Sequence, residues 1–315
     1  MKKAAGKAGK HGERWGRKFV DRRDWREYSR QLVERGRYFI DLDFVENWDS
    51  ELAVMNCGKV GPPFQYPNSL IELQAVWHAK SIPFRMIQGI TKEIVKFGRL
   101  PAAEHYSVAN RRMNRLSLKM LLPEGDSLFL FSDGTGVQAK SGGEYLRELY
   151  GKKNRCFIQV VILGEPGRKE PVSFEVHLVR TSEAESALRQ LDALEEQGVD
   201  IAGFGGDGSF DDFGVWDYIE SRGWAPAVKP DKNAVTDSKS RLRNQQVKER
   251  NRLLHKKWAR KRHYGDRWPG TEGIFSAVKR IFGEEVTATS RLGMIKQAGI
   301  KFWAYQRMKR FGEAA

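Results

Sequence analysis

Between residues 127 and 284 the chain alternates short β-rich segments with amphipathic helices, and this order restricts the fold more than any other feature. Three β-rich segments come first, and the later ones alternate with helical segments. Strands separated by helices usually lie parallel in a sheet that has helices on both faces. We therefore expect an α/β domain with a mixed sheet. The expected strands cover residues 127–133, 156–164, 173–179, 199–206 and 225–230.

The helical segments of this region have recognisable ends. In TSEAESALRQLDALEEQG, Ser182 and Glu185 form a capping box and Gly198 closes the helix. The other helices are expected over residues 212–223, 239–262 and 270–284. Sites in such sheets lie at the carboxyl ends of strands, which directs attention to the residues that follow each strand.

The preceding part of the chain, residues 21–122, has mostly helical periodicity. Three segments place apolar residues at steps of three and four: YPNSLIELQAVWHAK, IPFRMIQGITKEIVKFG and HYSVANRRMNRLSLKML. Asn68 or Ser69 is expected to cap the first helix, and Gly98 to end the second. With Arg111 and Arg112 on the third, these helices suit a helix-turn-helix DNA-binding module, and a generic helical bundle fits the same spacing.

The chain carries a large excess of positive charge. Lys and Arg total 55 against 40 Asp and Glu, a formal net charge of +15 that favours a polyanionic partner, nucleic acid first. Residues 239–262 hold eleven Lys or Arg against one acid, so this helix either contacts DNA or exposes a solvated basic face. The residues expected to contact DNA are Lys239, Arg241, Arg243, Lys256, Lys257, Arg260, Arg111 and Arg112.

Composition also argues against a membrane protein and a zinc protein. The longest apolar run, residues 157–163, is far too short to span a bilayer, and the basic N-terminus lacks the apolar segment of a secretory signal. Cys57 and Cys156 are expected to be reduced thiols, and two cysteines cannot build a multi-cysteine zinc site. We expect a cytoplasmic, nucleoid-associated protein with residues 1–20 as a disordered basic tail.

Three carboxylates from distant segments are candidates for one site. Asp133 is expected directly after the first strand, Asp207 directly after the fourth, and Glu272 at the start of the last helix. Carboxylates in such a group suit Mg²⁺ or Mn²⁺. A pair of such ions about 3.5–4 Å apart supports in-line attack at phosphodiesters. The alternative is that both aspartates, each next to a glycine, only form turns.

The glycines before Asp207 allow a second interpretation. Gly203, Gly205 and Gly208 satisfy the G-x-G-x-x-G pattern of dinucleotide-binding turns. That fingerprint normally follows the first strand of a βαβ unit, whereas here it follows three strands and a helix. Asp207 would also repel a pyrophosphate. We instead expect these glycines to leave the strand end open for a metal ion and a DNA backbone.

The segment from Asp133 to Glu284 resembles the catalytic domain of bacterial and archaeal insertion-sequence transposases of the DDE type, which have a ribonuclease-H-like fold. FSDGTGVQ matches the block of the first catalytic aspartate at Asp133. GGDGSFDD, followed by WAPAVKPDKNA, resembles the second block, with its catalytic position at Asp207. Asp211 and Asp212 correspond to an acid of that block that is not catalytic.

The third block of the family is a spaced Tyr-Arg-Glu-Lys signature. Tyr264 and Arg267 have the family's spacing, and so do Glu272 and Lys279. Four residues rather than three separate Arg267 from Glu272, because of the Trp-Pro-Gly-Thr sequence between them. Glu272 and Lys279 lie seven residues apart and would share one helix face. The N-terminal helices are similar to the corresponding part of the family, so the resemblance covers roughly residues 25 to 310.

The resemblance implies a transposase that cleaves DNA at the terminal inverted repeats of an insertion sequence and transfers the strand into target DNA. It implies Asp133, Asp207 and Glu272 as catalytic ligands of two Mg²⁺ ions, for which Mn²⁺ can substitute. The residues implied to position DNA are Tyr264, Arg267, Lys279 and Arg280.

The same resemblance suggests an organisation and a set of alternatives. Residues 21–122 would bind DNA, residues 123–290 would form the catalytic domain, and residues 291–315 would be a C-terminal helical extension. The partners would be double-stranded DNA and, at paired DNA ends, further copies of the chain. The alternatives are a ribonuclease-H-like nuclease or resolvase that does not join DNA, a catalytically silent DNA-binding derivative, and a nicotinamide-dependent oxidoreductase.

Overall fold

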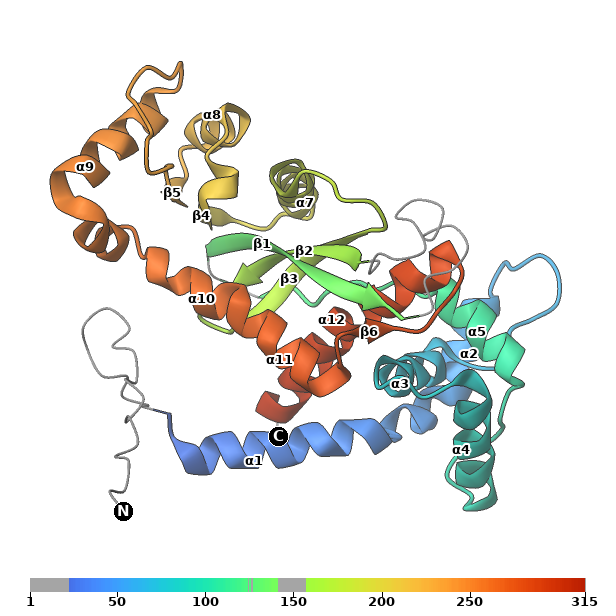
Figure 1. Cartoon of the computed structure of the whole chain (residues 1–315). Coiled ribbons are helices and arrows are strands. Elements are labelled where there is room, and N and C mark those ends of the chain that lie inside the picture. The colour runs from blue at the N-terminus through green and yellow to red at the C-terminus, as the bar shows by residue number, and fades with distance from the viewer. Residues whose placement is uncertain (1–22, 124, 126, 141–156, 315) are drawn as a thin grey trace, which may run out of the picture.

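A six-stranded mixed sheet forms the centre of the computed structural model, which describes residues 23–123, 125, 127–140 and 157–314 (Figure 1). The expected tail at residues 1–20 and Cys156 lie outside the described residues. The strand order is β3-β2-β1-β4-β5, with β6 pairing with β1. The strands are β1 Leu128–Ala139, β2 Phe157–Glu165, β3 Glu170–His177, β4 Ile201–Gly206, β5 Ala225–Val228 and β6 Glu285–Val286.

The pairing directions confirm the expected mixed sheet. Strand β2 pairs antiparallel with both β1 and β3, whereas β4 and β6 run parallel to β1, and β5 runs parallel to β4. Helices cover both faces, and α7 and α8 lie opposite α11 and α12 (Figure 1). These helices are α7 Glu183–Glu196, α8 Phe213–Arg222, α11 Glu272–Phe282 and α12 Arg291–Ala314. The arrangement is that of a ribonuclease-H-like fold preceded by an all-helical region.

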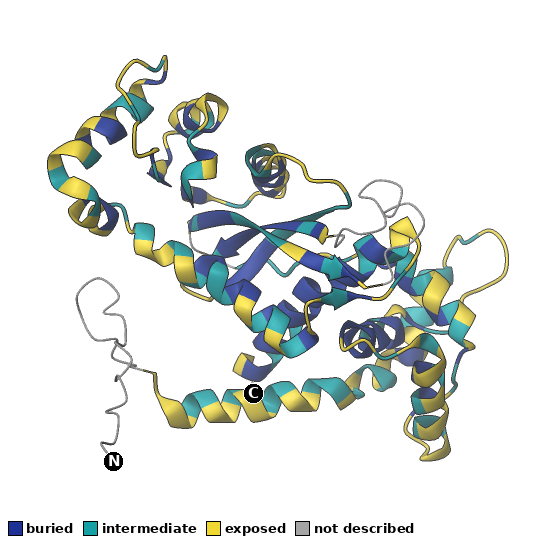
Figure 2. Cartoon of the chain, viewed as in Figure 1, coloured by how far each residue is buried: buried dark blue, intermediate teal, exposed yellow. Residues whose placement is uncertain are grey.

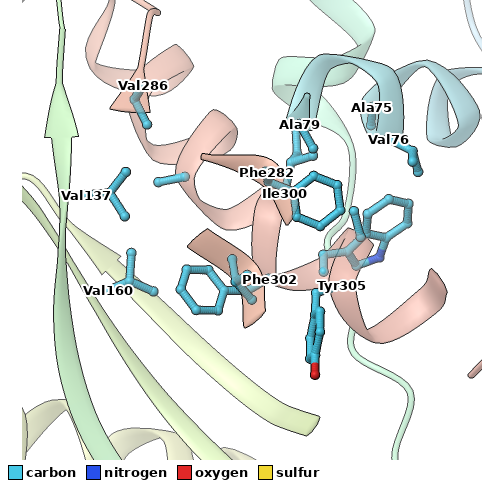
Figure 3. Close-up of a cluster of buried hydrophobic side chains, with 14 of the residues drawn as sticks. Ala75, Val76, Ala79, Val137, Val160, Phe282, Val286, Ile300, Phe302 and Tyr305 are labelled. Atoms are coloured by element: carbon cyan, nitrogen blue, oxygen red, sulfur yellow. The ribbon is translucent and has the colours of Figure 1, made fainter. Parts of the chain in front are cut away.

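The helical N-terminal region packs directly on the sheet domain. Its helices are α1 Trp25–Arg37, α2 Trp48–Asn56, α3 Asn68–Ala79, α4 Phe84–Lys96 and α5 Tyr106–Arg115, with short 3₁₀ helices η2 Tyr38–Ile40 and η3 Asp43–Asn47. Helix α3 is buried along most of its length, and α12 is buried beside it (Figure 2). Figure 3 shows side chains of α3, the sheet, α11 and α12 in one apolar cluster, so the two regions share a core.

Several local sequence signals have the expected effect. Ser182 caps α7 by accepting a hydrogen bond from the backbone N–H of Glu185. Gly198 follows α7 with φ +79°, and Gly98 follows α4 with φ +66°, backbone angles that favour glycine. The expected cap of α3 was wrong, because Pro67 precedes the helix and the carboxylate of Glu51 binds the backbone N–H and hydroxyl of Ser69 instead.

The first strand is longer than the sequence predicted, so Asp133 lies inside it and not after it. β1 continues to Ala139 because residues 133–138 stay paired with β2, and Gln138 and Ala139 also pair with β6. The short strand β6 was not predicted, since its two residues carry no alternating pattern. Asp133 therefore lies within the paired part of β1 and β2, with paired residues before and after it along the chain.

The long basic helix expected over residues 239–262 folds back on itself. Helix α9, Arg241–Lys261, contains a break at Leu254, where φ is 60° and ψ is 158°. Trp258 is fully buried between the two arms and donates a hydrogen bond from its indole N–H to Gln246, 3.3 Å away. Glu249 on the first arm pairs with Lys261 and Arg262 at the end of the second. Trp258 thus packs within a hairpin and does not stack on a partner.

A lysine of α12 holds the end of α11 in place. Lys301 is 1% exposed, and its ammonium donates to the carbonyl oxygens of Phe282 (2.9 Å), Gly283 (2.9 Å) and Glu285 (2.6 Å). These carbonyls belong to the last residue of α11, the turn after it and β6. Burial lowers the pKa of Lys301 to about 8, and the three acceptors offset the cost of a buried charge.

We expect Lys301→Met to lower the free energy of unfolding by about 2–3 kcal/mol, because three buried carbonyl groups lose a charged donor. Lys296→Met on the same helix is the matched control. Lys296 donates to a single carbonyl, that of Leu116, and its loss should cost clearly less. Urea denaturation of both variants measures the difference, and equal losses would show that the three hydrogen bonds of Lys301 do not fix α11.

Candidate active site

The parallel pairing of β1 with β4 places two of the predicted acids side by side. Phe131 of β1 lies opposite Gly205 of β4, and two residues further along the two strands stand Asp133 and Asp207. Asp207 follows the last residue of β4 and accepts hydrogen bonds from the backbone N–H and hydroxyl of Ser209, at 2.8 and 2.5 Å. The register confirms that β1 and β4 are parallel neighbours, but Asp133 lies inside β1 and only Asp207 follows the end of its strand.

The glycines before Asp207 serve packing within the protein. A Cβ atom on Gly205 would overlap the ring of Phe131, and one on Gly206 would overlap the ring of Phe210. Gly203 would in the same way overlap the ring of Phe129. The expectation that these glycines keep the strand end open was therefore wrong for these three positions, since aromatic side chains occupy the space. A dinucleotide-binding turn is not needed to explain them.

Arg267 links the first and third acids. One guanidinium nitrogen lies 3.1 Å from Oδ2 of Asp133, and the other lies 2.6 Å from Oε1 of Glu272. Arg267 begins the four-residue helix α10, Arg267–Gly270, and Glu272 begins α11. Thr271 between them is non-helical, with φ −136° and ψ −74°. This break absorbs the additional residue in the Tyr-Arg-Glu-Lys spacing, and Arg267 still reaches Glu272.

The electrostatics of the site follow from its partial burial. Burial raises the pKa of Asp133 to about 6, against the opposing effect of Arg267, and Asp207 and Glu183 add to the rise. Burial also raises the pKa of Tyr264. The charge of Arg267 opposes this rise, and the charge of Asp207 adds to it. Asp133 thus lies close enough to Asp207 and Arg267 for their charges to shift its pKa in opposite directions. Arg267 is the cation that contacts the carboxylates of Asp133 and Glu272.

The face of α11 continues the site. Glu272 and Lys279 line one open pocket of about 540 Å³, as predicted from their seven-residue separation. The pocket is lined by Glu272, Phe275, Ser276, Lys279, Arg280 and Glu284. Its lining includes two carboxylates, Glu272 and Glu284, and two cationic side chains, Lys279 and Arg280, which could contact a polyanion.

The basic residues predicted to contact DNA fall into two groups. Two of them are engaged within the protein. Arg243 pairs with the buried carboxylate of Asp211, and Arg112 donates to the carbonyl of Tyr66 and to Asn68. The exposed members are Lys239, Arg241, Lys256, Lys257, Arg260 and Arg111.

Asp211 is a structural acid, as its place in the second block suggested. Its side chain is 1% exposed, and its two oxygens accept from Arg243, from the indole N–H of Trp216 and from the backbone N–H of Asp231. Asp212 caps α8 by accepting from the backbone N–H of Gly214. The carboxylate of Asp211 is therefore fully engaged within the protein, and that of Asp212 serves as a helix cap.

Sequence reasoning missed three residues that shape the site. Glu183, the first residue of α7, lies over Gly134, where a Cβ atom would overlap its carboxylate. The hydroxyl of buried Thr271 donates to the carbonyl of Arg267, 2.9 Å away. Gly164 of β2 lets the backbone of Gly270 approach closely. Of these three, only Glu183 had a signal in the sequence. The glycine directly after Asp133 in FSDGTG, Gly134, is the position that faces Glu183.

The carboxylate oxygens of the site are suitable ligands for a hard divalent cation, although the three acids do not lie close enough together to form a complete metal site. Carboxylate oxygens are the ligands that Mg²⁺ and Mn²⁺ prefer. Among the residues that the structure describes, no group of three or more His, Cys, Asp and Glu side chains is close enough to hold a metal ion. The guanidinium of Arg267 lies between Asp133 and Glu272 and supplies the positive charge there.

Comparison with known families identifies the class of protein to which this fold belongs. The family model described as "Transposase DDE domain" matches residues 124–306. Because this match covers more than half of the chain, the chain belongs to the family of proteins with a transposase DDE domain. No curated protein sequence matches the chain. In the described part of the chain no helix is both long and apolar enough to cross a membrane.

We expect Gly164→Ala to destabilise the protein and to displace α10, which carries Arg267. The new methyl group would overlap the carbonyl oxygen of Gly270, which is backbone and cannot move without shifting α10 and Arg267. Overpacking of this kind costs about 1–3 kcal/mol of unfolding free energy. Gly265→Ala is the control, since nothing lies within 4 Å of its Cβ position. Urea denaturation followed by tryptophan fluorescence, which includes Trp268 of α10, tests this; equal stability of the two variants would contradict it.

Proposed function

We propose that this transposase cleaves DNA at the terminal inverted repeats of an insertion sequence and joins the freed ends to target DNA. The observation that supports the proposal is that Arg267 contacts both Asp133 of β1 and Glu272 at the start of α11. Asp207 follows β4, the parallel neighbour of β1, two residues after the paired residues Phe131 and Gly205. Membership of the family gives these three acids their proposed roles.

Each residue of the site has a proposed role. Asp133, Asp207 and Glu272 would hold two divalent ions, Mg²⁺ or Mn²⁺, which DDE transposases generally use. When bound, such ions activate an attacking oxygen and stabilise the leaving oxygen of a phosphodiester. Tyr264, Arg267, Lys279 and Arg280 would hold the DNA strand, because Lys279 and Arg280 lie along the pocket that begins at Glu272.

The DNA-binding surface would extend beyond this pocket. The hairpin of α9 leads into the site, since Trp258 and Tyr264 have ring centroids 5.5 Å apart. Its exposed Lys256, Lys257 and Arg260 would contact phosphates, as would Arg111 of the N-terminal helices. Residues 21–122 would read the inverted repeats. Because two DNA ends must be paired, the chain would act as an oligomer on DNA.

Two alternatives keep the same fold. A nuclease or resolvase would cut DNA at this site without joining it, and a silent derivative would bind DNA without cutting. Strand-transfer products would distinguish a transposase from a nuclease or resolvase. The presence of all three acids in the family's sequence order favours an active enzyme over a silent derivative. A nicotinamide-dependent enzyme is disfavoured by the glycines of β4, which pack on aromatic rings.

Asp207→Asn should abolish Mg²⁺-dependent cleavage and joining while DNA binding remains, because the substitution removes a ligand charge and leaves the fold intact. The assay uses a supercoiled plasmid that carries the DNA flanking the gene. Asp212→Asn is the matched control: it changes an acid five residues away whose role is to cap α8, and Asn caps helices equally well. Cleavage by Asp207→Asn at the wild-type rate would show that the acids are misassigned.

The double variant Lys256→Gln/Lys257→Gln should weaken DNA binding and make it less dependent on salt. Each lost phosphate contact reduces the slope of log K against log salt by roughly 0.9, so a reduction of about 1–2 is expected. Fluorescence anisotropy with a DNA duplex at several salt concentrations measures this slope. The control is Arg168→Gln/Lys169→Gln, an exposed basic pair in the β2–β3 turn. If both pairs changed the slope equally, the α9 hairpin would not be a specific DNA contact.

A further inference from the structure

The position of Arg267 suggests a role before DNA arrives. Its guanidinium binds Oδ2 of Asp133 and Oε1 of Glu272 at 3.1 and 2.6 Å. We infer that Arg267 is an internal counter-ion that occupies this carboxylate pair until a DNA phosphate draws it away, so that the divalent cation and DNA bind together. This inference rests on the function proposed above and assigns the order in which the site is assembled.

A divalent cation and Arg267 compete for the negative charge of these two carboxylates. The guanidinium holds Oδ2 of Asp133 and Oε1 of Glu272, and an ion that used the same two oxygens would displace it. The two cations would also repel each other at contact distance in a partly buried site. Arg267 has a side-chain exposure of only 18%, which makes its pairing stronger than a surface ion pair. Binding of the ion must therefore include the cost of displacing Arg267.

The segment that carries Arg267 is built to allow such a displacement. Arg267 starts a one-turn helix between two irregular points, His263 with φ 52° and Thr271 with φ −136° and ψ −74°. It is not part of helix α11, so its side chain can turn away from the carboxylates while the backbone of α10 and Glu272 stay in place. Its guanidinium already lies 5.8 Å from the ring centroid of Tyr264, a second surface on which a cation can rest.

DNA supplies the competing partner for the guanidinium. Arginine binds phosphate with two parallel hydrogen bonds, as strongly as it binds carboxylate. The pocket along α11 brings Lys279 and Arg280 to the same side as Glu272, so a DNA strand held there would pass close to Arg267. Transfer of Arg267 from carboxylate to phosphate would free two ligands at the moment that the substrate is in place. By linkage, DNA would then raise the affinity for the ion, and the ion would raise the affinity for DNA.

The test measures Mn²⁺ binding to the full-length protein without DNA, by electron paramagnetic resonance and by titration calorimetry. Arg267→Gln removes the competing charge and should raise the affinity for Mn²⁺ by about tenfold, within the range of coupling factors between sites. Lys279→Gln removes a nearby charge that does not contact the acids, and it should change the affinity much less. Arg267→Lys keeps the charge but cannot bridge both carboxylates, and it should lie between wild type and Arg267→Gln.

Thermal unfolding provides a second readout that does not depend on activity. Without Arg267 the two acids repel each other, so Arg267→Gln should be less stable than wild type and should regain more stability from Mn²⁺. The effect of Mn²⁺ on DNA affinity, measured with a short duplex at low salt, should be smaller in Arg267→Gln, because the shared residue that couples the two ligands is missing.

The outcomes separate this inference from the proposed function. Loss of Mn²⁺ binding in Asp133→Asn supports the metal site, whereas unchanged binding in that variant would place the ion elsewhere and overturn both. If Asp133→Asn loses Mn²⁺ but Arg267→Gln binds it no better than wild type, or not at all, the metal site stands and the counter-ion role of Arg267 is wrong. An equal gain in Arg267→Gln and Lys279→Gln would reduce the effect to general charge and would also overturn the inference.

Discussion

The parallel pairing of β1 with β4 is the constraint on which the site depends. Side chains on neighbouring parallel strands stay in step, so the register of Phe131 with Gly205 places Asp133 and Asp207 side by side. A slip of one residue would turn one carboxylate to the other face of the sheet. The glycines of β4 support this pairing because they let the rings of Phe129 and Phe131 pack across the two strands.

Glu272 is linked to Asp133 through Arg267, and packing of the C-terminal helices positions α11. Helix α12 crosses the sheet beside α3. Its Lys301 donates to the carbonyl groups at the C-terminal end of α11, and this contact fixes the helix that begins with Glu272. The close approach of Gly164 in β2 to Gly270 holds α10, which precedes α11, against the sheet. What results is a cluster of carboxylates with one guanidinium between them, and its chemistry depends on which cation occupies that place.

The mixed sheet could be predicted from the sequence because strand patterns are local signals, whereas the choice of Asp133, Asp207 and Glu272 rested on the resemblance to a family and stays a prediction. The capping of α7 by Ser182 and the end of α4 at Gly98 follow from short-range rules. Other features depend on distant partners and gave no such signal. The length of β1 is set by its pairing with β2 and β6, and the hairpin of α9 by the packing of Trp258 on Gln246. The pairing of Arg243 with Asp211 removes a predicted DNA contact for the same reason.

The central claim is that Asp133, Asp207 and Glu272 form one metal site. Replacing the ion with Fe²⁺ tests it most directly, because hydroxyl radicals formed at bound iron cut the polypeptide backbone nearby, and mass spectrometry locates the cuts. The account predicts three clusters of cuts, around β1, the end of β4 and the α10–α11 junction, all suppressed by excess Mg²⁺ and absent in Asp207→Asn. Cuts confined to other segments, or unchanged cutting in Asp207→Asn, would contradict it.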